Sequence, residues 1–309
     1  MKNRFPGFYP LHQDELETRL LDTIIAFDTN ALLTFYWLSD SNVNQLLSLL
    51  RSVNILDKLW LPYDVAWLYH QCMNTELLKQ RDCINNVLIS LKRCEDAIES
   101  PKQFPYLEDN LLNNLKELAE KIKTTCNRQR DKLSKGLLYY SIKDSLDELF
   151  SQKIGRYYEE SELKNIYTEG AKRQSDNIPP FCLQDESNDL RIKYHDLIVW
   201  KQIQAYAKKK QKDFLMVTGR ITNSWYTIVE NKPISPRQEL VNEFFNKSKR
   251  HFYCVSLYDF VDSSCSKLHI ILNNKFSLLN QLEPEVEGIS STHGSLISQL
   301  ITVSGTQSS

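Results

Sequence analysis

The sequence contains little glycine and no cysteine pair of the kind that binds metal. Only 8 of the 309 residues are glycine, while leucine, lysine, asparagine and serine are plentiful, a composition that favours helices. The 7 cysteines form no Cys-x-x-Cys pair and are odd in number, so we expect neither a zinc site nor a disulfide framework. This cysteine usage is typical of a reducing compartment and predicts a cytoplasmic protein.

Long apolar runs and an excess of charge of one sign are also absent. No run of 18 apolar residues occurs, and residues 1–14 lack the apolar centre of a signal peptide, so we expect no membrane span and no secretion signal. The formal net charge is −1, so any contact with nucleic acid must use a local basic patch. The hydrophobic share of 41% and the charged share of 25% are ordinary for a globular protein.

Predicted strands alternate with predicted helices along the chain. Short apolar runs, partly β-branched, predict buried strands at residues 23–27, 59–61, 214–219 and 252–257. Apolar residues at helical spacing predict helices at residues 31–37, 42–50, 195–208, 236–246 and 261–279. This alternation is typical of an α/β fold, in which helices cover both faces of a parallel sheet.

The predicted organisation has three parts. They are an N-terminal segment at residues 1–21, an α/β domain at 22–262, and a C-terminal helix with a mobile tail at 263–309. Residues 77–150 look almost wholly helical apart from a break at Pro101 and Pro105, which predicts a helical hairpin inserted into the domain. Such a hairpin either carries a binding surface or packs onto the sheet. Residues 151–190 are polar and are expected to be rich in turns.

Two acids occupy positions where α/β proteins often place their chemistry. Asp28 directly follows the first apolar run, and Asp196 stands at the start of the helix predicted at residues 195–208. Open sheets bind their ligands at the carboxyl ends of the strands, and Mg²⁺ and Mn²⁺ prefer carboxylate oxygens. The pair therefore suggests a metal-dependent nuclease centre. Each acid also has a simpler interpretation as a helix N-cap.

Five segments, in this order along the chain, resemble motifs of the PIN-like nuclease family. They are residues 27–33 with Asp28-Thr29-Asn30, residues 60–65, the Pro179-Pro180 turn, residues 194–203 with Trp200-Lys201-Gln202, and residues 214–218 followed by Trp225. The similarity covers about residues 22–245. It implies a compact α/β/α sandwich, a cluster of about four acids, a Mg or Mn ion and RNA hydrolysis. Members are often toxins or parts of bacterial defence systems.

The acidic motif of this family is incomplete here. The first and third acids match Asp28 and Asp196, which the resemblance assigns as the catalytic and metal-binding residues. Leu68 stands at the second position, and Gly219 with Arg220 at the fourth. Two carboxylates bind Mg²⁺ weakly, and an inward-pointing Arg220 would replace the cation with an ion pair.

Two interpretations of the incomplete centre stay open, together with a third that involves no nuclease activity. In the first, metal-dependent hydrolysis is weakened or lost and the chain binds nucleic acid, with RNA as the expected ligand. In the second, the protein is an active Mg- or Mn-dependent endoribonuclease that recruits Asp64, one helical turn before Leu68, or Asp185. In the third, the chain is a scaffold that binds only protein, either a partner or a second copy of itself.

Several polar residues accompany the two acids. His195 is a candidate general acid or base beside Asp196, or else a partly buried histidine with a hydrogen-bond partner. By the resemblance, Thr29, Asn30 and Thr218 support the metal ligands. Without it, they are cap and turn residues.

One stretch of the chain is strongly basic. Residues 121–135 contain a single acid, Asp131, and six cations: Lys121, Lys123, Arg128, Arg130, Lys132 and Lys135. A helix of this composition can contact the phosphates of RNA or of another single-stranded nucleic acid. The alternative is an ordinary solvated helix face.

Overall fold

A computed structural model describes most of the chain. The described residues are 1, 6–9, 22–98, 107–135, 137–180, 188–267, 272–282 and 285–286. They form two compact units, one of Met1–Cys72 with Asp147–Ser309 and the other of Met73–Leu146. Asp185, most of the N-terminal segment and nearly all of the predicted tail lie outside the described residues. No helix among the described residues is long and apolar enough to cross a membrane.

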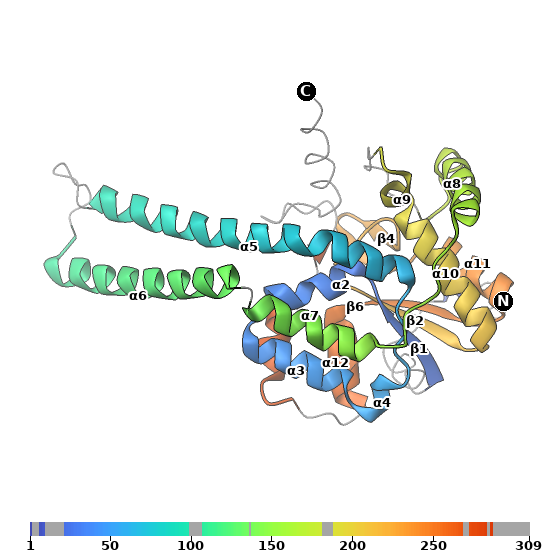
Figure 1. Ribbon diagram of the computed structural model, residues 1–309, viewed down its shortest axis with the longest axis horizontal. Coiled ribbons are helices and arrows are strands. Elements are labelled where there is room, and N and C mark those ends of the chain that lie inside the picture. The colour runs from blue at the N-terminus through green and yellow to red at the C-terminus, as the bar shows by residue number, and fades with distance from the viewer. Residues whose placement is uncertain are drawn as a thin grey trace. The chain divides into compact units, whose positions relative to one another are not determined.

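A parallel sheet of three strands forms the centre of the first unit. The strands are β1 (Thr23–Phe27), β2 (Asp213–Thr218) and β6 (Phe252–Ser256), in the order β1-β2-β6. All five residues of β1 are buried, as expected for a strand covered on both faces. The predicted parallel sheet is therefore confirmed, and Figure 1 shows it enclosed by helices.

Side chains from this sheet pack against helices on both faces. Phe27 contacts Phe260 of α12 (Leu257–Lys267) and Phe150 of α7 (Leu137–Phe150), with ring centroids 5.5 and 6.3 Å away. Phe252 contacts Trp200 of α10 (His195–Lys210) at 4.9 Å and Phe244 of α11 (Gln238–Ser248) at 5.5 Å. Because side chains alternate across a strand, these contacts use opposite faces of the sheet. The predicted α/β/α sandwich is confirmed.

Shorter elements surround this core. They are η1 (Pro6–Phe8), α2 (Thr29–Thr34), η3 (Phe35–Trp37), α3 (Asp40–Leu50), α4 (Val53–Leu56), α9 (Leu190–Lys193), α13 (Lys275–Gln281), the parallel pair β3 (Arg220–Ile221) and β7 (Glu285–Val286), and the antiparallel pair β4 (Tyr226–Val229) and β5 (Lys232–Pro236). The helix predicted at residues 261–279 is represented by α12 and α13. The hairpin of β4 and β5 was not predicted.

The strand predicted at residues 59–61 is reduced to single bridges. Leu59 pairs with Ile25 and Leu61 pairs with Ile154. Pro62 follows without a backbone N–H, and α5 (Tyr63–Ile98) begins one residue later. The hydrogen bonding between strands therefore ends at Leu61.

One helix was missed in the sequence. Residues 151–190 were expected to be rich in turns, yet α8 (Glu160–Ser175) lies among them. Its buried side is mixed: Leu163 and Ile166 are buried, and buried Arg173 donates to Glu169, to Glu243 of α11 at 2.7 Å and to the backbone oxygen of Pro179. Apolar periodicity detects a helix by its hydrophobic face, so a helix whose buried side is short and includes an ion-paired arginine gives a weak signal.

The second unit is helical. It contains most of α5, all of α6 (Asp109–Ser134) and the beginning of α7. Figure 1 shows α5 and α6 side by side, and an ion pair of 2.8 Å between Lys123 Nζ and Glu95 Oε1 joins them. Along α6 only Ala119 and Cys126 are buried, so the seam between the two helices is thin.

Candidate functional site

Asp28 caps the first helix after the sheet. It follows β1 directly, and its backbone is extended, with φ −81° and ψ 172°. Its Oδ1 accepts hydrogen bonds from the backbone N–H of Ala31 at 2.6 Å and of Gly219 at 3.0 Å. The residue is only 8% exposed. One carboxylate oxygen is thus used to fix the start of α2 and the end of β2.

The other carboxylate oxygen of Asp28, Oδ2, lies beside the Thr218 hydroxyl, which has two possible acceptors but only one hydrogen to donate. Thr218 Oγ1 lies 2.5 Å from Asp28 Oδ2, 2.6 Å from the backbone oxygen of Arg220 and 3.2 Å from the backbone nitrogen of Arg220. A hydroxyl has one hydrogen to donate, and the Arg220 carbonyl can only accept. A proton on Asp28 Oδ2 resolves the conflict, because Asp28 then donates to Thr218 and Thr218 donates to the carbonyl.

The electrostatics of this position favour a proton on Asp28 at mildly acidic pH. Burial raises the pKa of Asp28 to about 6, against the lowering effect of its three hydrogen-bond donors. The negative charge of Asp196 raises this pKa further, so the two acids lie within electrostatic reach of each other. A metal ion would have to compete with these neutral hydrogen-bonding groups and, below about pH 6, with the proton.

Gly219 lies directly against the backbone at the start of α2. A Cβ atom on Gly219 would lie 2.4 Å from the backbone carbon of Asn30 and 2.5 Å from the backbone nitrogen of Ala31. These are backbone atoms of α2 that cannot turn aside. The position at which the family resemblance expects a fourth acid therefore has no space for a side chain.

Asp196 and His195 begin α10, and Asp196 lies within electrostatic reach of Asp28. The Asp196 side chain is 25% exposed, and its Oδ1 lies 3.7 Å from His195 Nδ1. His195 is buried, and its Nε2 lies 3.2 Å from the backbone oxygen of Asp64. Since a carbonyl can only accept, Nε2 carries the hydrogen of that bond. His195 thus matches the simpler interpretation, a buried histidine with a partner.

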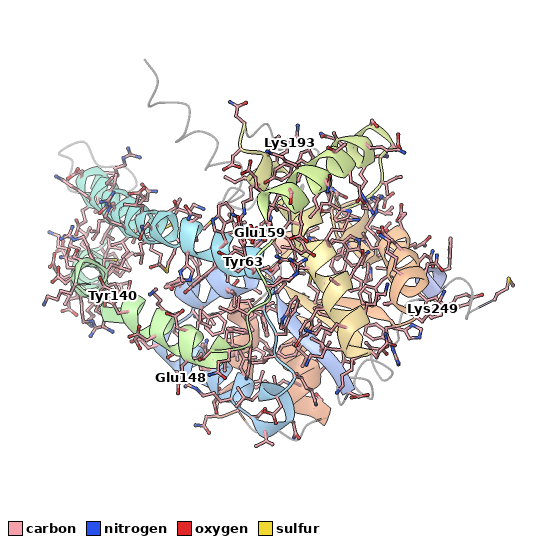
Figure 2. All side chains as sticks on the ribbon, turned by 45° about the vertical axis from the view of Figure 1, so that its right-hand side comes forward. Tyr63, Tyr140, Glu148, Glu159, Lys193 and Lys249 are labelled. Carbon is pink, nitrogen blue, oxygen red and sulfur yellow. The ribbon has the colours of Figure 1, made fainter. Side chains whose placement is uncertain are left out.

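Asp64 is engaged by other groups and is not free to join the two acids. It is fully buried, its Oδ1 accepts from Arg191 Nε at 2.7 Å, and its Oδ2 accepts from Gln202 Nε2 at 2.8 Å. The Arg191 guanidinium lies 4.2 Å from the centre of the Trp67 ring. Figure 2 labels Tyr63 of α5 and Lys193 of α9, which mark the two elements that this ion pair connects.

The arginine in this pair is not the one that the sequence suggested. Arg220 was expected to meet Asp28 or Asp196 if it pointed inward, but its described contacts with Thr218 are made by its backbone. Arg191 and Gln202 were not singled out as site residues. The only signal was that Gln202 belongs to the Trp-Lys-Gln motif.

The described residues do not fit a divalent metal site. Leu68 is buried in the core, at 2% exposure, where the second acid was expected. Among the residues that the structure describes, no group of three or more His, Cys, Asp or Glu side chains could hold an ion. Thr29 is buried, and Asn30 uses its backbone oxygen to accept from Thr34 Oγ1. The groups around Asp28 thus serve as a helix cap and as hydrogen-bond partners.

The basic stretch lies on α6 in the second unit. Lys121, Arg128 and Lys132 are exposed, and their spacing of seven and four residues places them on one side of the helix. Lys123 is used differently, because it forms ion pairs with Glu95 and Glu120 that raise its pKa. Arg130 is exposed but lies on another side of the helix.

Comparison with known families adds one finding. The family model of a PIN-like domain matches residues 24–240 of the chain. No curated protein and no solved structure matches the chain significantly. The matched range contains Asp28, Asp64, Asp196 and Gly219, together with the whole second unit.

Proposed function

Because the chain belongs to the PIN-like domain family, we propose that it is a nuclease-fold protein that binds RNA and has lost metal-dependent hydrolysis. The observation that carries this proposal is the engagement of its acids by protein groups. Asp28 is bonded by three neutral groups, the backbone N–H of Ala31 and of Gly219 and the Thr218 hydroxyl, and Asp64 is bonded by Arg191 and Gln202. Hydrolysis by this family would need such carboxylates on an ion.

The basic side of α6 supports binding to single-stranded RNA. Lys121, Arg128 and Lys132 present three positive charges along one face of the helix. Neutralising phosphates with such charges releases condensed counterions, which is the main source of sequence-independent affinity. A place in a bacterial defence or toxin–antitoxin complex is a proposal that rests on the family resemblance alone.

Loss of hydrolysis is tested by incubating the purified protein with labelled single-stranded RNA in Mn²⁺ and in Mg²⁺. The proposal expects no cleavage by the wild-type protein, by Asp28→Asn or by Asp196→Asn. Cleavage by the wild type that both substitutions abolish would overturn the proposal and establish the active endoribonuclease instead. Cleavage that persists equally in all three proteins identifies a contaminating nuclease, and the assay is then repeated after further purification.

RNA binding is tested by fluorescence anisotropy with the same RNA. We expect the triple variant Lys121→Gln, Arg128→Gln and Lys132→Gln to bind on the order of tenfold more weakly, and its affinity to depend less on salt. A control of equal charge change uses three exposed lysines of the first unit: Lys164→Gln, Lys172→Gln and Lys208→Gln. Equal weakening by both triples, or no binding by the wild type, would contradict the assignment of α6.

A further inference from the structure

A group of aromatic rings surrounds the Arg191 side chain at the surface of the first unit. Tyr63 and Trp67 are four residues apart, so they project from the same side of α5. The Arg191 Cζ atom lies 4.2 Å from the centre of the Trp67 ring, and 5.9 Å from the centres of the Tyr63 and Tyr157 rings. We call Tyr63, Trp67, Tyr157 and Arg191 the aromatic cluster. All four residues belong to the first unit.

The aromatic cluster is fixed by contacts within the first unit. The backbone N–H of Gly155 donates to the backbone oxygen of Leu61 at 2.8 Å, which holds the segment that carries Tyr157. The Tyr157 ring contacts the Tyr63 ring, with centroids 5.3 Å apart. Arg191 is held by its ion pair with the buried carboxylate of α5. Because the rings are already in place, a ligand that stacks on them loses little free energy in ordering them.

The aromatic cluster also presents ring surface to solvent. Tyr157 is 41% exposed, and Tyr63 and Trp67 are half-buried. The planes of the Tyr63 and Tyr157 rings meet at 74°, an edge-to-face contact that uses the face of only one of the two rings. The Arg191 side chain is 17% exposed. The cluster therefore combines accessible ring surface with a guanidinium group.

This composition suits the base of a nucleotide better than its phosphate. Arg156 and Arg191 are each paired with a carboxylate, so their charge is already compensated. Every base has a π face, which stacks on aromatic rings and on guanidinium groups. We propose that the aromatic cluster binds an unpaired base of single-stranded RNA, stacked on the ring of Tyr157. This inference rests on the proposed RNA binding and adds a base contact to the phosphate contacts of α6.

Fluorescence anisotropy of the full chain with two labelled probes of about 12 nucleotides tests the proposal. One probe is oligouridine RNA, and the other is the same ribose-phosphate backbone without bases. We expect the wild type to bind oligouridine on the order of tenfold more tightly, because both probes offer the same phosphates and only one offers bases to stack. Tyr157→Ala should remove most of this preference and leave the affinity for the abasic probe unchanged.

The salt dependence of binding distinguishes this contact from the phosphate contacts of α6. Tyr157→Ala changes no charge, so the dependence of affinity on salt should stay that of the wild type. The triple variant of Lys121, Arg128 and Lys132 should instead reduce that dependence and weaken the binding of both probes alike.

Two further substitutions at position 157 separate stacking from folding. Tyr157→Phe keeps the ring and should retain the preference for oligouridine. Tyr157→Leu keeps an apolar side chain without a ring and should lose most of the preference. The matched control is Tyr140→Ala, at a tyrosine of the second unit that is 60% exposed, and it should bind both probes like the wild type.

The outcomes for base stacking and for RNA binding can be told apart. Equal binding of the two probes by the wild type would overturn the stacking proposal and leave RNA binding through phosphates standing. A preference that Tyr157→Ala and Tyr157→Leu leave unchanged would also overturn it. A wild type that binds neither probe would contradict RNA binding itself, and the stacking proposal would fail with it.

Discussion

Asp28 and Asp64 are two buried carboxylates of the same unit, and the protein accommodates them in opposite ways. Asp64 is paired with a cation, the Arg191 guanidinium, and with the Gln202 amide. Asp28 contacts only neutral hydrogen-bonding groups, and burial raises its pKa to about 6. Retained acids therefore do not by themselves indicate a retained metal site. A metal ion would compensate the negative charge of these buried carboxylates. For Asp64 the Arg191 guanidinium does so, and for Asp28 a bound proton can do so.

Removing the cation should have the largest effect. Arg191→Met leaves Asp64 buried without a positive partner, and breaking a buried pair in this way costs about 3–5 kcal/mol of the free energy of unfolding. Urea denaturation followed by circular dichroism measures the loss. Arg156→Met is the control, because this exposed arginine also pairs with an acid, Glu162, and such surface pairs contribute about 1 kcal/mol or less. A loss as small as that of the control would contradict the importance of the buried pair.

If Arg191 acts on stability through the charge of Asp64, a second substitution should restore part of the loss. The double variant Arg191→Met with Asp64→Asn contains neither buried charge. We expect it to be more stable than Arg191→Met alone, since the uncompensated carboxylate has been removed. Equal instability of the two variants would show that Arg191 stabilises mainly by packing on Trp67.

The neutral environment of Asp28 should appear as a dependence of stability on pH. The pKa of Asp28 in the folded state is about 6, above its ordinary value of 3.8, so the folded state holds the proton more tightly. Its contribution to stability is complete below pH 3.8 and is lost as the pH rises through 6, by up to about 3 kcal/mol. Asp28→Asn cannot ionise.

This dependence is measured as the difference between two stability curves. We expect the stability of the wild type relative to Asp28→Asn to fall as the pH is raised from 4 to 8. The difference cancels contributions of opposite sign from other groups, such as Glu243, whose pKa is lowered to about 2 by its hydrogen bonds with Arg173 and Lys247. Parallel curves for the two proteins would contradict the assignment of a proton to Asp28.

The close approach at Gly219 should give the smallest of these effects. Gly219→Ala places a methyl group 2.4 Å from a backbone atom of Asn30, and overpacking of this kind typically costs about 1–3 kcal/mol. A lower urea midpoint with an unchanged m-value would report the loss. A substitution without effect would show that α2 can shift, and that position 219 has more space than the structure indicates.

The elements of the sheet were predictable because their signal is local. β1, β2 and β6 are short apolar runs, and each lies within one or two residues of its predicted position. α8 was missed because its buried apolar residues are few, and ion pairs of its Arg173 with Glu243 and of its Glu169 with Lys201 complete its packing. The pair of Asp64 and Arg191 joins residues 127 positions apart, and no pattern of spacing indicates such a contact.

The fold class, the family resemblance and the lack of acids at positions 68 and 219 follow from residue type and order, so they can be read from the chain alone. The roles of the remaining acids depend on the folded structure. The charge and the ligands of a carboxylate depend on which donors lie within about 3 Å, and here those donors come from distant segments. Gly219 and Thr218 reach Asp28 across 191 and 190 positions of the chain, and packing of the sheet brings them there.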